Sequence, residues 1–250
     1  MTGRDEDALL DLQSVDIGDF GGLVRSVAYD DETIIRAIMR LFLDGRPFDA
    51  DVTYSTGRFW RNLPEPSLKF DIVPQAAGVV QADARALPLA SSSLDSIMFD
   101  PPFIVRYRTA PETSAIAQRF GGYYDFADLW TFYADALREF ARVLRVGGIV
   151  AFKCQDIVSG MKNYMTHAVV IMLAQMEGFY VRDLFIRVNN NVMWSPNMRS
   201  QRHARKIHSY YVVLERTRSQ ALHATYMIDV GRWLRARAEK TYTKPIQEKA

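Results

Sequence analysis

An acid, two prolines and an aromatic residue, Asp100-Pro101-Pro102-Phe103, directly follow the apolar run of residues 96–99. The Asp100 carboxylate can accept one hydrogen from an amine. The Pro101 carbonyl can accept a second, because Pro102 has no N–H and the two prolines fix the backbone. The ring of Phe103 offers a flat surface on which a planar molecule can stack. These groups would hold an –NH₂ group with its lone pair facing an electrophile; a structural turn after a strand is the alternative interpretation.

The elements around the tetrapeptide predict an α/β fold. Residues 31–43, with Asp30 or Asp31 as N-cap, 126–145, capped by Asp125, and 161–177 have helical patterns. Strands are expected at 47–53, 68–72, 78–83, 96–100, 149–152, 179–188 and 207–214. Strands that alternate with helices predict a mostly parallel sheet covered on both faces. The last two strands are separated by a loop alone, which predicts an antiparallel hairpin.

Four acidic residues fall near the carboxyl ends of four consecutive predicted strands: Asp51, Asp71, Asp83 and Asp100. Ligands of parallel α/β sheets bind outside these ends. Asp71 follows Asp51 by 20 residues, a position that suits the two hydroxyls of a ribose. Each acid alone is typical of a loop or a helix cap, but four in register with four strands favour a nucleotide site.

The loop at residues 53–57 follows the first of these acids and is small and polar, which lets a ligand approach the backbone. It holds one glycine, Gly57, where a dinucleotide fingerprint needs three. This composition argues against the pyrophosphate of NAD and is compatible with a cofactor that has no phosphates.

The tetrapeptide resembles the signature of class I S-adenosylmethionine-dependent amino-methyltransferases, and the resemblance covers about residues 31–216. In that family the signature binds a nucleobase amine beside the methyl group of the cofactor. The resemblance therefore implies that Asp100, Pro101, Pro102 and Phe103 are catalytic. It also implies a Rossmann-like seven-stranded methyltransferase sheet, mostly parallel with a terminal antiparallel hairpin.

Other stretches fit the same family in chain order. Residues 51–57 are similar to its glycine-loop motif, although Ser55 stands where a glycine is usual; Asp71 matches the ribose-binding acid and Asp83 the residue that contacts adenine. The cofactor-binding residues that the resemblance implies are Asp51, Thr53, Ser55, Gly57, Asp71, Asp83 and Ala84. Lys153-Cys154-Gln155-Asp156 and residues 201–211 resemble small methyltransferases of bacteria and their phages, which act mostly on DNA.

The charge distribution points to a nucleic-acid partner. Residues 196–250 hold 12 Lys and Arg against 4 Asp and Glu, whereas residues 1–195 hold 19 against 25. A basic segment on an acidic body favours a polyanion; for 232–250, a solvated basic tail is an equal alternative. The candidate nucleic-acid contacts are Tyr123, Tyr124, Arg199, Arg202, Arg205 and Lys206. A loop that packs on the body and a solvated connection are their alternatives.

Enzymes that share an Asn- or Asp-Pro-Pro-aromatic signature act on amines of DNA, of RNA or of protein glutamine. The resemblance, with Asp and not Asn at position 100, implies an exocyclic amine of adenine or cytosine in DNA as the substrate. An RNA base amine remains open, since residues 104–124 are too short for a large recognition domain and a homodimer or a partner would have to assist. A catalytically inactive nucleic-acid-binding protein is the second class of function, suggested by the poor glycine loop.

Composition sets the remaining bounds on the 250 residues. We expect a catalytic domain at 1–216 that includes an N-terminal extension at 1–30, and a basic, helical C-terminal extension at 217–250. No apolar run reaches the roughly 20 residues of a membrane span, and the polar N-terminus is unlike a signal peptide. The single cysteine, Cys154, excludes an internal disulfide and a cysteine-cluster zinc site. The expectations are therefore a soluble cytoplasmic protein without a metal.

Overall fold

The computed structural model describes residues 22–103, 125–159, 161–189 and 203–218. Within these ranges an eight-stranded sheet has the order β1-β9-β10-β6-β5-β2-β3-β4. Its strands are β1 (Val27–Ala28), β2 (Ala50–Asp51), β3 (Leu68–Asp71), β4 (Val80–Gln81), β5 (Leu94–Phe99), β6 (Leu144–Cys154), β9 (Phe179–Val188) and β10 (His208–Arg216). A separate hairpin pairs β7 (Ile157–Ser159) with β8 (Lys162–Tyr164).

The direction of the strands confirms the predicted fold class. β2, β3, β4, β5 and β6 pair in parallel, whereas β10 is antiparallel to both of its neighbours, β6 and β9. The antiparallel hairpin predicted from the last two segments is therefore present. Three strands were not predicted. The two-residue β1 extends the sheet beyond β9, to which it is parallel, so the sheet has eight strands and not the expected seven. The other two, β7 and β8, form the separate hairpin.

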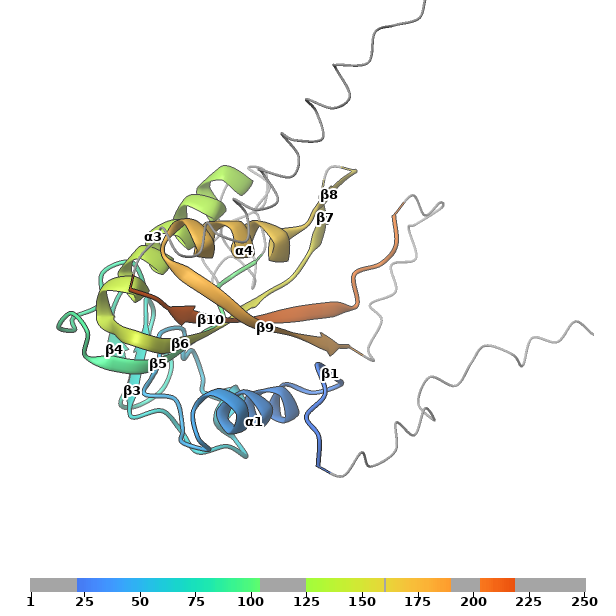
Figure 1. The fold of residues 1–250 in the computed structure, drawn as a ribbon. Helices are drawn as coiled ribbons and strands as arrows, with labels where there is room; N and C mark the ends of the chain where they lie inside the picture. The colour runs from blue at the N-terminus through green and yellow to red at the C-terminus, as the bar shows by residue number, and fades with distance from the viewer. Residues whose placement is uncertain (1–21, 104–124, 160, 190–202, 219–250) are drawn as a thin grey trace, which may run out of the picture.

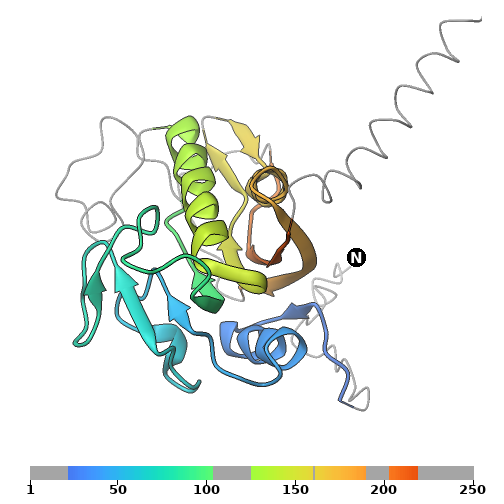
Figure 2. The same ribbon diagram turned by 60° about the vertical axis from the view of Figure 1, so that its left-hand side comes forward.

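Helices cover both faces of the sheet (Figures 1 and 2). α3 (Phe126–Val143) and α4 (Thr166–Met176) lie on one face, and α1 (Asp31–Phe42) lies on the other with the short 3₁₀ helix η2 (Arg58–Trp60). Two apolar cores result, one under α3 and α4 and one under α1 and η2. Helices therefore cover both faces of the sheet. Asp51, Asp71 and Asp100 lie at the edge that the carboxyl ends of its parallel strands form.

The helix starts follow from local side-chain capping. Asp30 accepts a hydrogen bond from the Thr33 backbone N–H at 2.7 Å at the start of α1. Asp125 accepts one from the Asp128 N–H at 2.9 Å at the start of α3. Both residues match the predicted caps, because a carboxylate at this position satisfies an N–H that the first helical turn leaves free.

The predicted boundaries differ most from the observed ones in two places. The helix expected at 161–177 begins at Thr166, because Lys162–Tyr164 pairs as β8. The helix expected at 126–145 stops at Val143, and the strand expected at 149–152 begins at Leu144, so that Gly147 and Gly148 lie inside β6. Gly147 has a φ of 86° at an interruption in the β5–β6 register, a backbone conformation that glycine adopts without strain.

Several expectations concern residues outside the described ranges. Tyr123, Tyr124, Arg199 and Arg202 belong to this group, as do residues 1–21 and the C-terminal residues 219–250. No helix within the described residues is long and apolar enough to cross a membrane.

Candidate functional site

The loop after β2 has a tight backbone with two left-handed residues. Gly57 has a φ of 71°, and a Cβ added there would lie 2.6 Å from the Tyr54 hydroxyl. Ser55 has a φ of 50°. A side-chain-bearing residue in this conformation costs roughly 1–2 kcal/mol relative to the right-handed form. Ser55, which stands where the amino-methyltransferases that the sequence resembles usually have a glycine, thus adopts a conformation that suits glycine.

Asp51 stabilises this loop through hydrogen bonds to its buried carboxylate. The carboxylate is buried, with 2% of the residue exposed. It accepts hydrogen bonds from the Thr53 N–H at 2.8 Å and, through its other oxygen, from the Trp60 indole N–H at 2.8 Å. Burial raises the pKa of Asp51 to about 7, although these hydrogen bonds favour the ionised form. Among the described residues its contacts are therefore internal, and it shapes the loop on which a ligand would lie.

Asp71 connects the end of β3 to the same loop. One of its carboxylate oxygens accepts the Ser55 N–H at 2.7 Å, and the other accepts the Val73 N–H at 2.9 Å. Each carboxylate oxygen has two lone pairs, so both can still accept a further hydrogen bond. Asp71 is partly exposed, which leaves it able to receive the hydroxyls for which its position was predicted.

Asp83 follows β4 and is paired with a neighbour that the sequence reasoning did not consider. Its carboxylate accepts the Arg85 N–H at 2.9 Å and pairs with the guanidinium at 2.6 Å. The Arg85 hydrogen bond holds the pKa of Asp83 below its usual range. Ala84, the next residue, is buried. An adenine at this position would therefore meet a carboxylate that Arg85 already orients.

Asp100 lies directly after β5 and is tied to the loop after β2. Its backbone N–H donates to the Thr53 hydroxyl at 2.8 Å. Its Oδ1 atom is buried and has no hydrogen-bond partner in the described part of the chain. Its Oδ2 atom lies 3.9 Å from the Lys153 ammonium. Burial raises the pKa of Asp100, and the charge of Lys153 offsets part of this effect.

The two prolines and the aromatic ring complete the tetrapeptide. Pro101 is buried, whereas Pro102 and Phe103 are half-buried. The Tyr133 hydroxyl donates to the Pro102 carbonyl at 3.0 Å. This bond anchors the tetrapeptide to α3 through the Pro102 carbonyl. The Pro101 carbonyl belongs to the residue that directly follows Asp100 in the chain.

The remaining predicted site residues are described in part. Arg205 and Lys206 are half-buried and precede β10, and the Gln155 side-chain amide donates to the Lys206 carbonyl at 3.4 Å. No group of three or more potential metal ligands occurs within the described residues. The sequence reasoning also missed Lys153, Asp31 and Tyr211 as functional candidates, although Lys153 belongs to a stretch that resembles the family.

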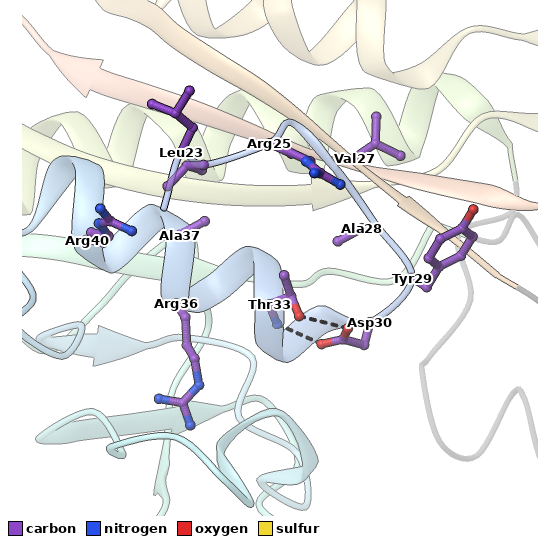
Figure 3. A pocket seen from close by; sticks show the side chains of 11 residues that line it. Leu23, Arg25, Val27, Ala28, Tyr29, Asp30, Thr33, Arg36, Ala37 and Arg40 are labelled. Atoms are coloured by element: carbon purple, nitrogen blue, oxygen red, sulfur yellow. Dashed lines mark hydrogen bonds between the residues drawn. The ribbon is translucent and has the colours of Figure 1, made fainter. Parts of the chain in front are cut away.

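A groove of about 470 Å³ lies elsewhere, between the chain before β1 and α1 (Figure 3). Leu23, Ala28 and Arg40 are among its lining residues, as are Asp30 and Thr33, which are joined by a hydrogen bond. None of Asp51, Asp71, Asp83 and Asp100 lines it. This groove is therefore separate from the candidate site.

The order of the strands, with the antiparallel β10 between β6 and β9, defines an α/β sheet of the Rossmann-like methyltransferase type. By sequence, no protein-family profile and no curated protein matches the chain. Solved structures with a similar fold do exist.

One similar structure is a candidate DNA modification methylase of Thermus thermophilus in complex with S-adenosyl-L-methionine, with 16% identity, a TM-score of 0.39, and coverage of 55% of this chain and 54% of that one. TrmN from Thermus thermophilus has 19% identity and a TM-score of 0.44 over 74% of this chain and 48% of its own. The [4+2]-cyclase SpnF has 12% identity and a TM-score of 0.48, with coverage of 74% of this chain and 81% of that one. The chain therefore spans about half the length of the first two proteins.

Proposed function

We propose that this protein is an S-adenosylmethionine-dependent methyltransferase that acts on the exocyclic amine of adenine or cytosine in DNA. The observation that carries the proposal is the Asp100 Oδ1 atom, which is buried and has no partner among the described residues. An unpaired buried acceptor costs about 1–3 kcal/mol. A ligand N–H would remove this cost, and an amine, which has two N–H donors, suits a carboxylate next to the Pro101 carbonyl.

The residues around the loop fit the proposed cofactor. Asp71 has lone pairs left for the hydroxyls of a ribose, and Asp83 with Ala84 lies at the next strand end, where the adenine would be. A small loop without a phosphate-binding glycine cluster suits a nucleoside without phosphates. When bound, the cofactor supplies an electrophilic methyl group on a sulfonium. Asp51 and Thr53 would keep the loop after β2 in the conformation that binds the cofactor.

The proposed catalytic work of the chain is positioning and charge stabilisation. Asp100 and the Pro101 carbonyl would each accept one N–H of the amine, which directs its lone pair away from them. As the new C–N bond replaced the methyl–sulfur bond and the sulfur left as a neutral thioether, the nitrogen would become positive, and the adjacent carboxylate would stabilise that charge. Asp100 need not be a strong base beforehand, because the amine proton becomes acidic only once nitrogen is alkylated. In-line placement of the two reactants supplies much of the rate.

The substrate base would have to leave its helix. A base inside a duplex cannot reach a pocket at a sheet edge, so it would be flipped out and stacked on Phe103. Arg205 and Lys206, with Arg199 and Arg202, would hold the backbone phosphates, and Tyr123 and Tyr124 would contact the opened strand. A second copy of the chain would extend this modest recognition surface.

Ser55 favours a second candidate, a nucleic-acid-binding protein of the same fold without catalysis. Its φ of 50° retains a strained backbone where glycine would relieve it. Isothermal calorimetry with S-adenosylmethionine separates the two candidates, because the inactive protein would bind none. If Ser55→Gly binds S-adenosylmethionine and the wild-type protein does not, the second candidate is supported.

The proposed activity is tested by tritiated methyl transfer from S-adenosylmethionine to DNA, tRNA and rRNA in parallel, followed by nucleoside mass spectrometry. We expect a methylated adenine or cytosine amine in DNA. Label in RNA alone would replace DNA with RNA as the substrate. Absence of label in every nucleic acid, with the cofactor bound, would overturn the proposal.

A further inference from the structure

A lysine whose side chain is 11% exposed lies behind the Asp100 carboxylate. The Lys153 Nζ atom is 3.0 Å from Asp31 Oδ1 and 3.9 Å from Asp100 Oδ2. Lys153 is on β6, beside β5, which ends immediately before Asp100. One ammonium therefore stands between two carboxylates that are distant in sequence, one from the start of α1 and one from the end of a strand.

Aromatic rings restrict where this ammonium can move. The Nζ atom lies 4.4 Å from the centre of the Phe59 ring and 5.4 Å from that of Tyr211. Both rings favour a cation at this distance. Because Tyr211 is fully buried in the core under α1 and the Lys153 side chain itself is only 11% exposed, the ammonium is held beside the two carboxylates.

Asp31 is in turn fixed by partners of its own. The Tyr211 hydroxyl donates to Asp31 Oδ1 at 2.6 Å, and the Arg187 Nε atom lies 3.8 Å from Oδ2. Asp31 is also the first residue of α1, where the helix dipole favours a negative charge. Burial raises the pKa of Asp31, but Lys153, Tyr211 and Arg187 outweigh burial and bring it below the usual value. An ionised Asp31 therefore holds Lys153 at the Asp100 side.

The charge of Lys153 opposes the effect of burial on the pKa of Asp100, whereas the negative charge of Asp31 adds to that effect. A buried carboxyl group loses hydration and becomes easier to protonate, whereas a cation within about 4–6 Å favours its ionised form. A protonated Asp100 would present a hydroxyl donor to an incoming amine and would stabilise less of the developing positive charge. The charge of Lys153 is thus of direct use to the proposed reaction.

We propose that Lys153, held by Asp31, is a positioning residue that keeps the Asp100 carboxylate ionised and occupies its Oδ2 side, which leaves Oδ1 for the substrate amine. The chemical role of Asp100 in this inference rests on the proposed function. The electrostatic relationship between Lys153 and Asp100 does not depend on it and can be measured without any substrate.

The direct test is the titration of Asp100 in full-length protein labelled with ¹³C-aspartate, with its carboxyl signal assigned by its loss in Asp100→Asn. The groups that interact with Asp100 electrostatically are Lys153, Asp31, Asp51, Cys154 and Tyr211. In Lys153→Met we expect the Asp100 midpoint to rise by about one pH unit or more. Lys153→Arg, which keeps the charge, should restore most of the wild-type value.

Lys69→Met is the matched control. Lys69 also pairs with an acid, Glu65, and lies 5.1 Å from the centre of an aromatic ring, that of Tyr54, but it has no contact with Asp100. The Lys69→Met variant should therefore leave the midpoint of the Asp100 titration unchanged. Lys153→Gln serves in place of the methionine variant if that variant does not fold. An unchanged Asp100 midpoint in a folded, uncharged Lys153 variant would overturn the inference.

The activity test separates this inference from the proposed function. The acid limb of the methyl-transfer rate in Lys153→Met should move to higher pH, with partial recovery of the rate in alkaline buffer and rescue by Lys153→Arg. A purely structural role would lower the rate at every pH alike, and that result would also contradict the inference. If the wild-type protein methylates nothing, the proposed function fails while the Asp100 titration still decides the electrostatic claim.

Discussion

The Asp100 backbone N–H donates a hydrogen bond to the Thr53 hydroxyl at 2.8 Å. This bond joins the loop after β2, which would hold the cofactor, to the tetrapeptide after β5, which would hold the substrate amine. The two strands are neighbours in the sheet, and the bond fixes the relative position of their carboxyl ends. A methyl donor and its acceptor need such a fixed relationship, because misplacement of reacting groups lowers the rate steeply.

Removal of this bond should affect both stability and activity. Thr53→Val keeps the size of the side chain but leaves the Asp100 N–H without its acceptor, so we expect the free energy of unfolding to fall by about 1–3 kcal/mol. Urea unfolding measures this change. Thr53→Ser retains a hydroxyl and should recover most of it; equal losses in both variants would mean that the hydroxyl is not what matters.

Asp71 should contribute to cofactor binding. If it accepts hydrogen bonds from a ribose, Asp71→Ala should weaken S-adenosylmethionine binding by roughly 1.5–3 kcal/mol, the scale of hydrogen bonds to a charged group. Calorimetry gives the dissociation constant. Asp95→Ala removes an acid that is partly exposed and paired with Arg145, and it controls for general effects on the fold. An unchanged dissociation constant in folded Asp71→Ala would remove this residue from the site.

Asp51 should make the protein less stable as pH rises. Its pKa is about 7 in the folded protein against an ordinary value of 3.8, so the folded state binds the proton more tightly. The stabilisation from this proton is complete below about pH 4 and is lost as pH rises towards and through about 7. Asp51→Asn cannot titrate and should therefore gain stability relative to the wild type over that range, by a few kcal/mol at most.

The measurement is urea unfolding of both proteins from about pH 4 to about pH 8. Asp83→Asn gives a comparison of opposite sign, because the Arg85 hydrogen bond lowers the pKa of Asp83. The contribution of Asp83 is present above its ordinary pKa of 3.8 and is lost as pH falls through the folded value, so the unfolding series for Asp83→Asn is extended down to about pH 2. A stability difference between wild type and Asp51→Asn that is constant with pH would contradict the elevated pKa of Asp51.

The basic residues before β10 should set the salt dependence of nucleic-acid binding. Neutralisation of Arg199, Arg202, Arg205 and Lys206 should weaken binding and flatten the plot of log K against log salt, by about 0.9 per lost phosphate contact on duplex DNA. The control variant neutralises four exposed arginines elsewhere on the protein and changes the net charge by the same amount. These are Arg40, Arg138, Arg145 and Arg182. Superimposable slopes for the first variant and the wild type would leave these four residues without a role in binding.

The fold was predictable from the sequence because strand ends are marked locally. Asp51, Asp71 and Asp100 each close an apolar run, and parallel strands bring such ends to one edge of the sheet. Phe179–Val188 was predicted with its observed bounds, since it is long and rich in β-branched and aromatic residues. Short segments were less certain: Lys162–Tyr164 continues into an apolar helix, and three residues carry no distinct period.

The partners of the site residues were harder to predict. Asp83–Arg85 is local, and an acid two residues before an arginine is a visible signal. Asp51–Trp60 needs the η2 turn to bring the indole back over the strand. Lys153 meets Asp31 across more than a hundred residues, so this pair depends on the sheet order as a whole and has no signature in either local sequence.

The most direct test of the account is the methyl-transfer rate of Asp100→Ala with cofactor binding measured on the same preparation. Removal of the carboxylate deprives the amine of its acceptor and the developing charge of its partner, so the rate should fall by about 10²-fold or more. The S-adenosylmethionine dissociation constant should stay within about twofold, because the backbone N–H that bonds Thr53 remains. A wild-type rate in Asp100→Ala would contradict the central claim.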